Sequence, residues 1–112
     1  MVVKSEAAIL AECRLEASRL GAIVWRNNSG AYKDARGNYI KYGVCNPGGA
    51  DLIGIYKGRF LAIECKSSTG RATEAQLNFI RVVNDLGGIA GVCRCKEDVK
   101  LLLDNSSNRT IL

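Results

Sequence analysis

Phe60-Leu61-Ala62-Ile63-Glu64-Cys65-Lys66 is the stretch that decides the fold, because an apolar run ends there in an acid and a lysine two residues apart. Side chains alternate between faces along a strand, so Glu64 and Lys66 point the same way. A second apolar run, opened by Asp51, comes just before it, and Lys57-Gly58-Arg59 is a short turn between the two. The two runs therefore predict a central hairpin that brings Asp51 beside Glu64.

Acids and a lysine at the buried end of a sheet are expensive to remove from water. A divalent cation between the acids would offset that cost, with the lysine facing a substrate or water. The pattern thus predicts a metal-dependent phosphodiesterase site, and a salt bridge at a strand edge is the alternative. The segment Pro47-Gly48-Gly49-Ala50 before Asp51 favours the site, because its glycines let backbone or substrate approach closely.

The composition is that of one globular domain. The chain has 112 residues, of which 47% are apolar and 24% charged, and such a chain can bury a real core. No apolar run is long enough to span a membrane, and the N-terminus has no signal-peptide pattern. The formal charge of +5 at pH 7 favours a polyanionic partner.

Cysteine and histidine usage narrows the chemistry. The five cysteines are odd in number and contain no C-x-x-C pair, which supports neither a disulfide framework nor a zinc ribbon. We expect reduced thiols and a cytoplasmic protein. The sequence has no histidine, which excludes Ser-His-Asp and Cys-His catalysis. Catalysis would have to use carboxylates, lysine or a metal.

The order of elements predicts an α/β fold, with a mixed central sheet flanked by helices. Apolar periodicity and turn residues place the helices over 4–20, 73–86 and 97–103, the strands over 22–26, 51–56, 60–66 and 89–95, and a hairpin turn at 35–38. No repeat or linker marks a second domain, so 1–112 is expected to be a single domain. The polar segment 104–112 is expected to be a loosely held tail.

Two further polar side chains fall on apolar helix faces. Glu6 lies in line with Leu10 and Cys13 on a helical wheel, so it points toward the core unless it stays solvated in the first turn, where acids favour the helix dipole. Gln76 leads the apolar face of the second helix and also occupies the N3 position of a capping box that starts at Thr73. Gln76 could therefore orient a water or phosphate oxygen, cap the helix, or do both.

Segment 26–43 has the composition of a nucleic-acid contact. It interleaves basic residues with tyrosines, namely Lys33, Arg36 and Lys41 with Tyr32, Tyr39 and Tyr42. This mixture suits backbone contacts and stacking on bases or sugars. An ordinary solvated hairpin is the alternative.

Together these residues resemble the PD-(D/E)xK nuclease superfamily, and within it the stand-alone VRR-Nuc domains found in bacteriophages. The similar segments follow the family order along nearly the whole chain: Trp25-Arg26-Asn27-Asn28-Ser29-Gly30, Gly48-Gly49-Ala50-Asp51-Leu52-Ile53-Gly54, Ile63-Glu64-Cys65-Lys66, Glu74-Ala75-Gln76 and Gly87-Gly88-Ile89-Ala90-Gly91-Val92. One departure is that no proline directly precedes Asp51, since Pro47 lies four residues earlier.

The resemblance implies a restriction-endonuclease-like core and Mg²⁺- or Mn²⁺-dependent cleavage of DNA. It further implies a homodimer that cuts branched DNA such as Holliday junctions, acting in the cytoplasm of a bacterial host if the chain is phage-encoded. One metal site per domain and two cuts per junction also favour a two-fold pair. A general DNA nuclease without branch preference and a non-catalytic DNA-binding module are the alternatives. Intact Asp51, Glu64 and Lys66 favour an enzyme.

Site roles follow from the same resemblance. The expected metal ligands are Asp51, Glu64, the main-chain carbonyl of Cys65 and, directly or through water, Glu6. Lys66 is expected to orient the attacking water and to offset charge in the transition state, and Gln76 to position water or phosphate. The expected DNA contacts are Arg26, Asn28, Lys33, Arg36, Lys41 and Arg71.

Overall fold

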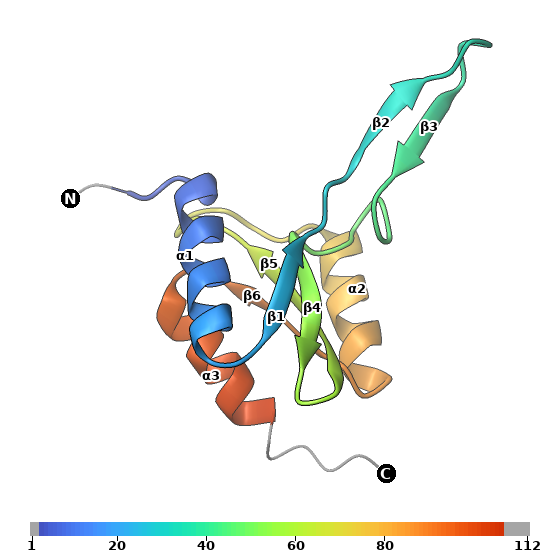
Figure 1. The fold of residues 1–112 in the computed structure, drawn as a ribbon. Coiled ribbons are helices and arrows are strands. Elements are labelled where there is room, and N and C mark those ends of the chain that lie inside the picture. Colours follow the sequence, from blue (N-terminus) through green and yellow to red (C-terminus); the bar gives the residue numbers. More distant parts are fainter. Residues whose placement is uncertain (1–2, 107–112) are drawn as a thin grey trace.

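A four-stranded mixed sheet lies at the centre of the computed structural model, which describes residues 3–106 (Figure 1). In chain order the elements are α1 (Glu6–Arg19), β1 (Ile23–Arg26), β2 (Gly30–Lys33), β3 (Tyr39–Tyr42), β4 (Leu52–Tyr56), β5 (Arg59–Cys65), α2 (Glu74–Asp85), β6 (Ile89–Cys93) and α3 (Lys96–Ser106). The expected α/β class, with helices flanking a mixed sheet, is confirmed.

The central hairpin has the predicted register. The strand order in the sheet is β1-β4-β5-β6, with β5 and β6 parallel and the other neighbours antiparallel. Lys57 and Gly58 form the two-residue turn with φ values of 49° and 76°, and a turn with positive φ at both positions fixes hairpin register. Leu52 therefore pairs with Ile63, which brings the preceding Asp51 level with Glu64.

Each face of the sheet has its own core. α1 and α3 cover one face, where Cys13 and Leu103 join sheet residues such as Leu52 and Ile63 in a fully buried cluster (Figure 1). α2 covers the other face over β5 and β6, where Ala62 and Ala90 leave space for its larger side chains, Phe79, Ile80 and Val83. The small residues let the helix approach closely over the strand that carries Glu64.

Helix boundaries follow the capping signals in the sequence. Ser5 caps α1 by accepting a hydrogen bond from the amide of Ala8 at 3.2 Å. Thr73 caps α2, and the predicted capping box with Gln76 is present in both directions. Both helices end before a glycine with a φ of 97°, at Gly21 and Gly87, a conformation that glycine adopts without strain.

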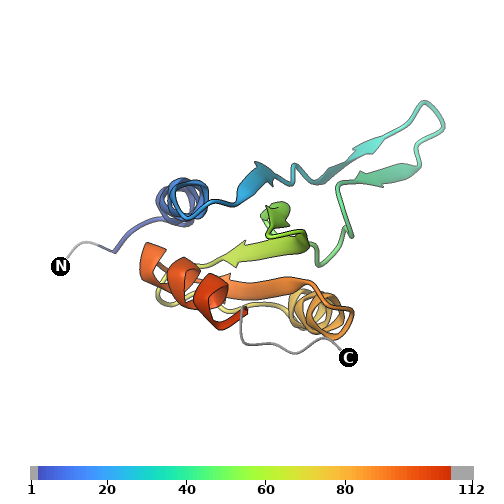
Figure 2. The same cartoon turned by 60° about the horizontal axis from the view of Figure 1, so that its bottom comes forward.

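β2 and β3 form a separate two-stranded ribbon that projects away from the body of the molecule (Figures 1 and 2). We call residues 30–42 the arm. At its tip Asp34 Oδ1 accepts hydrogen bonds from the amides of Arg36 and Asn38, so the predicted turn at 35–38 is confirmed. At its base the side-chain Nδ2 of Asn46 donates to the carbonyls of Gly30 and Tyr42 at 2.8 Å, which ties the two strands together where they leave the body.

α3 is longer than predicted. It continues to Ser106, three residues into the segment expected to be a loose tail, and Ser106 is buried. The guanidinium of Arg59 on β5 donates a hydrogen bond to the carbonyl of Ser106 at 2.8 Å. This contact with β5 stabilises a helix end that the sequence pattern did not predict. Residues 107–112, the rest of that predicted tail, lie outside the described residues. None of the helices within 3–106 combines the length and apolar character needed to cross a bilayer.

The Arg59 guanidinium is expected to contribute more to stability than any other polar side chain in the described residues, because it links β5 to the end of α2 and the end of α3. It donates to the carbonyls of Gly87, Gly88 and Ser106 at 2.8–3.2 Å. Arg59→Met should lower the free energy of unfolding by about 2–3 kcal/mol, because three partly buried carbonyls lose a charged donor. Urea titration measures the change. Arg81→Met is the matched control, since that exposed guanidinium pairs on the surface of α2, and an equal loss in both variants would contradict the assignment.

Candidate active site

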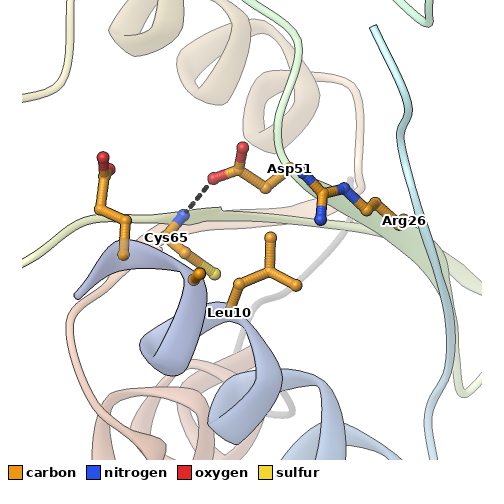
Figure 3. A pocket seen from close by; sticks show the side chains of 6 residues that line it. Leu10, Arg26, Asp51 and Cys65 are labelled. Carbon is orange, nitrogen blue, oxygen red and sulfur yellow. Dashed lines mark hydrogen bonds between the residues drawn. The ribbon is translucent and has the colours of Figure 1, made fainter. Parts of the chain in front are cut away.

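Asp51 and Glu64 lie at the same end of the central hairpin. Asp51 immediately precedes β4, and its Oδ2 accepts a hydrogen bond from the amide of Cys65 at 2.8 Å (Figure 3). This bond joins the start of β4 to the end of β5. The pairing predicted from the sequence is therefore present, with Glu64 as the neighbouring residue on β5.

Glu64 is held in an unfavourable environment for a charge. It is only 2% exposed, and within residues 3–106 its Oε2 has no hydrogen-bond partner. Burial, followed by interaction with Asp51, raises the pKa of Glu64 to about 8 from its ordinary value of 4.5. A buried acid without a partner is costly, and this oxygen is available to accept a contact from an external group.

Lys66 lies between two acids without hydrogen-bonding either. Its Nζ is 3.9 Å from Glu64 Oε1 and 3.8 Å from Glu6 Oε1, and its side chain is 14% exposed. These separations are longer than a hydrogen bond. The salt bridges that the alternative interpretation requires are therefore present, but their N···O separations are long. The N–H donors of the ammonium remain available to another group.

A cavity of about 220 Å³ opens beside these residues. Its lining consists of Glu6, Ala7, Leu10, Arg26, Asp51 and Cys65 (Figure 3). Glu6 stands in the first turn of α1 with 57% of its side chain exposed, so it faces this cavity and Lys66 rather than the apolar core. The structure therefore brings Glu6, Asp51 and the predicted DNA contact Arg26 around one space, whereas Glu64 and Lys66 are outside its lining.

The residues present fit a divalent cation of the magnesium type. In the described part of the chain, no three His, Cys, Asp or Glu side chains come close enough to form a complete ligand set. Mg²⁺ is usually held by one or two carboxylates, and water and substrate phosphate supply the remaining ligands. Asp51 and Glu64 offer such a pair, and the unpartnered Oε2 is the oxygen left for it.

Gln76 is engaged as a helix cap. Its Oε1 accepts a hydrogen bond from the main-chain amide of Thr73 at 2.8 Å, and the main-chain amide of Gln76 donates to Thr73 Oγ1 at 3.1 Å. The capping interpretation is confirmed. Gln76 is outside the lining of the cavity, and its side-chain NH₂ is the group left for the predicted role toward water or phosphate.

The predicted DNA contacts are exposed and distributed over several segments. Arg26 ends β1 at the cavity, Lys33 and Lys41 are on the arm, and Arg36 is in the turn at its tip. Asn28 lies in the connection from β1 to the arm, and Arg71 in the loop before α2. The basic residues thus extend from the candidate site to the end of the arm.

Two positioning residues had no role assigned from sequence. Arg94 Nη1 donates to the carbonyls of Ser67 and Gly70, which holds the loop that follows Lys66. Asn27 donates to the carbonyls of Val44 and Ala50 at 3.0 Å, which fixes the chain just before Asp51. Asn27 lies in a segment that resembles the family, so its role could have been suspected from sequence. The role of Arg94 could not be predicted from neighbouring residues, because its partners come from another part of the chain.

The glycines before Asp51 have the predicted purpose. A Cβ on Gly49 would lie 1.9 Å from the carbonyl oxygen of Val44, and one on Gly48 would lie 2.8 Å from that of Ala75. Gly48 also has a φ of 101°. Larger residues would therefore displace the backbone that leads into Asp51.

A mixed sheet flanked by helices, with two acids and a lysine gathered at the end of its central hairpin, is the arrangement of a restriction-endonuclease-like core, the fold class of many nucleases. The family model described as VRR-NUC domain matches residues 8–97. The chain therefore belongs to the VRR-NUC domain family, which implies a nuclease-type function in DNA processing. Of the predicted site residues, Glu6 alone precedes the matched region. No curated protein matches the chain.

Proposed function

We propose that the protein is a Mg²⁺- or Mn²⁺-dependent DNA endonuclease with Asp51, Glu64 and Lys66 at its centre. The observation that carries the proposal is the Glu64 carboxylate, buried beside Asp51 with no partner at Oε2 among residues 3–106. A bound cation would offset the cost of that burial. The neighbouring ammonium of Lys66 supplies the positive charge that phosphodiester cleavage needs.

Asp51 and Glu64 would hold the cation with the carbonyl of Cys65, and Glu6, which lines the cavity, would contact it directly or through water. A bound cation of this kind would supply Lewis-acid polarisation of the phosphate and a lowered pKa of bound water. Lys66 would donate a hydrogen bond to the attacking water or to a phosphate oxygen. Gln76 contributes its side-chain NH₂ to the same phosphate while its oxygen remains in the helix cap.

Cleavage of branched DNA by a homodimer is part of the proposal. Each chain supplies one candidate site, and a symmetric pair of cuts across a four-way junction requires two. A two-fold pair would present both sites to the two-fold arrangement of strands at the branch. A linear duplex of arbitrary sequence has no branch for such a pair to recognise.

The deciding experiment compares DNA structures under controlled metal conditions. Purified protein with Mg²⁺ or Mn²⁺ is incubated with a four-way junction, a flap, a linear duplex and a single strand. We expect symmetric paired nicks at the junction and none in EDTA. Equal cutting of duplex and junction would support the general nuclease, binding without any cleavage would support the non-catalytic module, and full activity in EDTA would exclude the metal.

Mixed dimers test whether the two sites act in one complex. When wild-type chains are mixed with Glu64→Gln chains, heterodimers should nick one strand at the junction and leave the other intact. Denaturing gels with each strand labelled separately show which strands are cut. If the mixture yields only paired nicks, in an amount that follows the fraction of wild-type chains, no heterodimer cuts a single strand. That result would contradict the proposal that each site of a dimer cuts one strand.

The basic residues near the cavity and arm tip are expected to bind DNA backbone. Neutralising Arg26, Lys33 and Arg36 to Gln together should weaken binding to all sequences alike. It should also flatten the slope of log affinity against log salt by about 2–3, because each lost phosphate contact releases fewer counterions. Fluorescence anisotropy over a salt series measures both quantities.

A triple variant of Arg14, Lys57 and Lys100 to Gln provides the matched control, since it removes the same charge from exposed positions on α1, the β4–β5 turn and α3. This control should keep most of the salt dependence. Equal slopes for the two triple variants would mean that net charge, and not this surface, governs binding.

A further inference from the structure

The two faces of the arm differ in chemistry. Gly30 pairs with Tyr42 and Tyr32 with Ile40, whereas Ala31 pairs with Lys41 and Lys33 with Tyr39. Paired residues share a face of a ribbon, and the faces alternate along it. The aromatic face therefore consists of Gly30, Tyr32, Ile40 and Tyr42, and the basic face of Ala31, Lys33, Tyr39 and Lys41.

The aromatic face is ordered but uncovered. The Tyr42 ring lies over Gly30, where an added Cβ would be 2.5 Å from its hydroxyl oxygen, and the Tyr42 and Tyr32 ring centroids are 6.5 Å apart. Even so, Tyr32, Ile40 and Tyr42 are 55%, 39% and 49% exposed. A lone two-stranded ribbon is marginally stable in water, so a packed aromatic face of this kind indicates a contact surface.

The body carries a second uncovered apolar surface. α2 and its core cluster cover β5, β6 and Ile53 of β4 on this face of the sheet but leave β1 and the Ile55 end of β4 open. There Ile23 pairs with Ile55 and Ile55 with Phe60, and Trp25 follows on the same face of β1. These four residues, which we call the open sheet face, are 41–61% exposed.

Charge decides between DNA and protein as the partner of these surfaces. Surfaces that stack nucleic-acid bases combine aromatic rings with basic side chains, but the paired residues of the aromatic face and the open sheet face include no lysine or arginine. The lysines of the arm are on its opposite face. An apolar protein surface therefore suits the aromatic face, and phosphate suits the basic face.

The area available matches a second copy of this chain. Seven large apolar residues are each about half exposed on the two surfaces. Four of the seven are aromatic, and at about 200 Å² per aromatic side chain they offer roughly 400 Å². The three isoleucines add to this area, toward the ~800 Å² that each partner buries in a standard interface. In a two-fold pair each copy contributes both surfaces, so self-association uses the whole of this area.

We propose that the aromatic face of the arm docks on the open sheet face of a second copy, in a two-fold symmetric dimer. The arm projects away from the body of its own chain (Figures 1 and 2), and its aromatic face is exposed to a neighbour. The basic face stays exposed at the edge of the dimer, where it contacts DNA phosphate. The inference rests on the dimer of the proposed function and names the surfaces that form it.

The test measures mass in solution by sedimentation equilibrium. Wild type should have twice the 12.1 kDa mass of one chain. Tyr32→Ser with Tyr42→Ser should give the mass of one chain, and so should Trp25→Gln, which leaves the arm intact. The matched control, Lys33→Gln with Lys41→Gln, should keep the dimer mass and lose DNA affinity. Circular dichroism and urea unfolding identify any variant that fails to fold.

A cross-link gives an independent reading of the interface. A photoreactive phenylalanine analogue at position 32 should join the peptide containing Trp25 of an isotopically distinct copy. A wild-type monomer at micromolar concentration would overturn the inference, as would aromatic-face variants that remain dimeric but lose DNA affinity, which would assign that face to DNA. A wild-type dimer that loses mass as expected but cuts no DNA would keep the interface and reject the nuclease.

Discussion

Glu64→Gln is expected to abolish cleavage. It should also make the metal-free protein more resistant to alkaline pH, where the wild type loses stability. The folded protein raises the pKa of Glu64 to about 8, against 4.5 ordinarily. The folded state therefore keeps a proton that the unfolded state releases, so the contribution of Glu64 is full below about pH 4.5 and is lost as pH rises through about 8. A neutral glutamine has no such dependence.

The expected sizes are large. Cleavage should fall by at least about a thousandfold because the cation loses a ligand, while DNA binding survives, since a negative charge has been removed. Between pH 5 and pH 9 in EDTA, the wild type should lose up to roughly 3–5 kcal/mol more unfolding free energy than the variant. Urea titrations at each pH and junction-cleavage assays with Mg²⁺ measure the two effects.

Glu6→Gln is the control, because this acid faces the same cavity with 57% of its side chain exposed. It should reduce activity only in part and leave the pH dependence of stability close to that of the wild type. If Glu64→Gln retains turnover, or shows the wild-type loss of stability at high pH, the buried acid is not the metal ligand that we propose.

Lys66→Ala is expected to slow the chemical step by about 10³-fold with little loss of stability. Removing one preorganised donor to a developing charge costs about this much. The two ion pairs of Lys66 are 3.8 and 3.9 Å long, so their loss should cost less than about 1 kcal/mol. Single-turnover cleavage and urea unfolding of the same preparation measure both.

Lys100→Ala serves as a benchmark for a surface ion pair, since its Nζ is 2.7 Å from Asp104 on α3. It should leave the rate of cleavage unchanged. A structural salt bridge at Lys66 would produce the opposite balance, with a marked loss of stability and a modest loss of rate, and that result would reject a role in catalysis.

Local patterns were sufficient to predict most elements of the fold. The hairpin from Leu52 to Cys65 follows from two apolar runs and a turn at Lys57-Gly58, and its two-residue loop fixes which residues are opposite each other. The start of α2 follows from a capping box contained within four residues. The pairing of Asp51 with Glu64 was predictable because it depends only on this hairpin.

The sequence by itself therefore determined the class of fold, the acid pair and the two-stranded arm, because each depends on residues close together in the chain. Tertiary structure alone decided the remainder. It placed Glu6 beside Lys66, held the loop after Lys66 through Arg94, extended α3 to Ser106 and left the face around Trp25 open. These features depend on contacts between distant segments, and local periodicity carries no information about which segments meet.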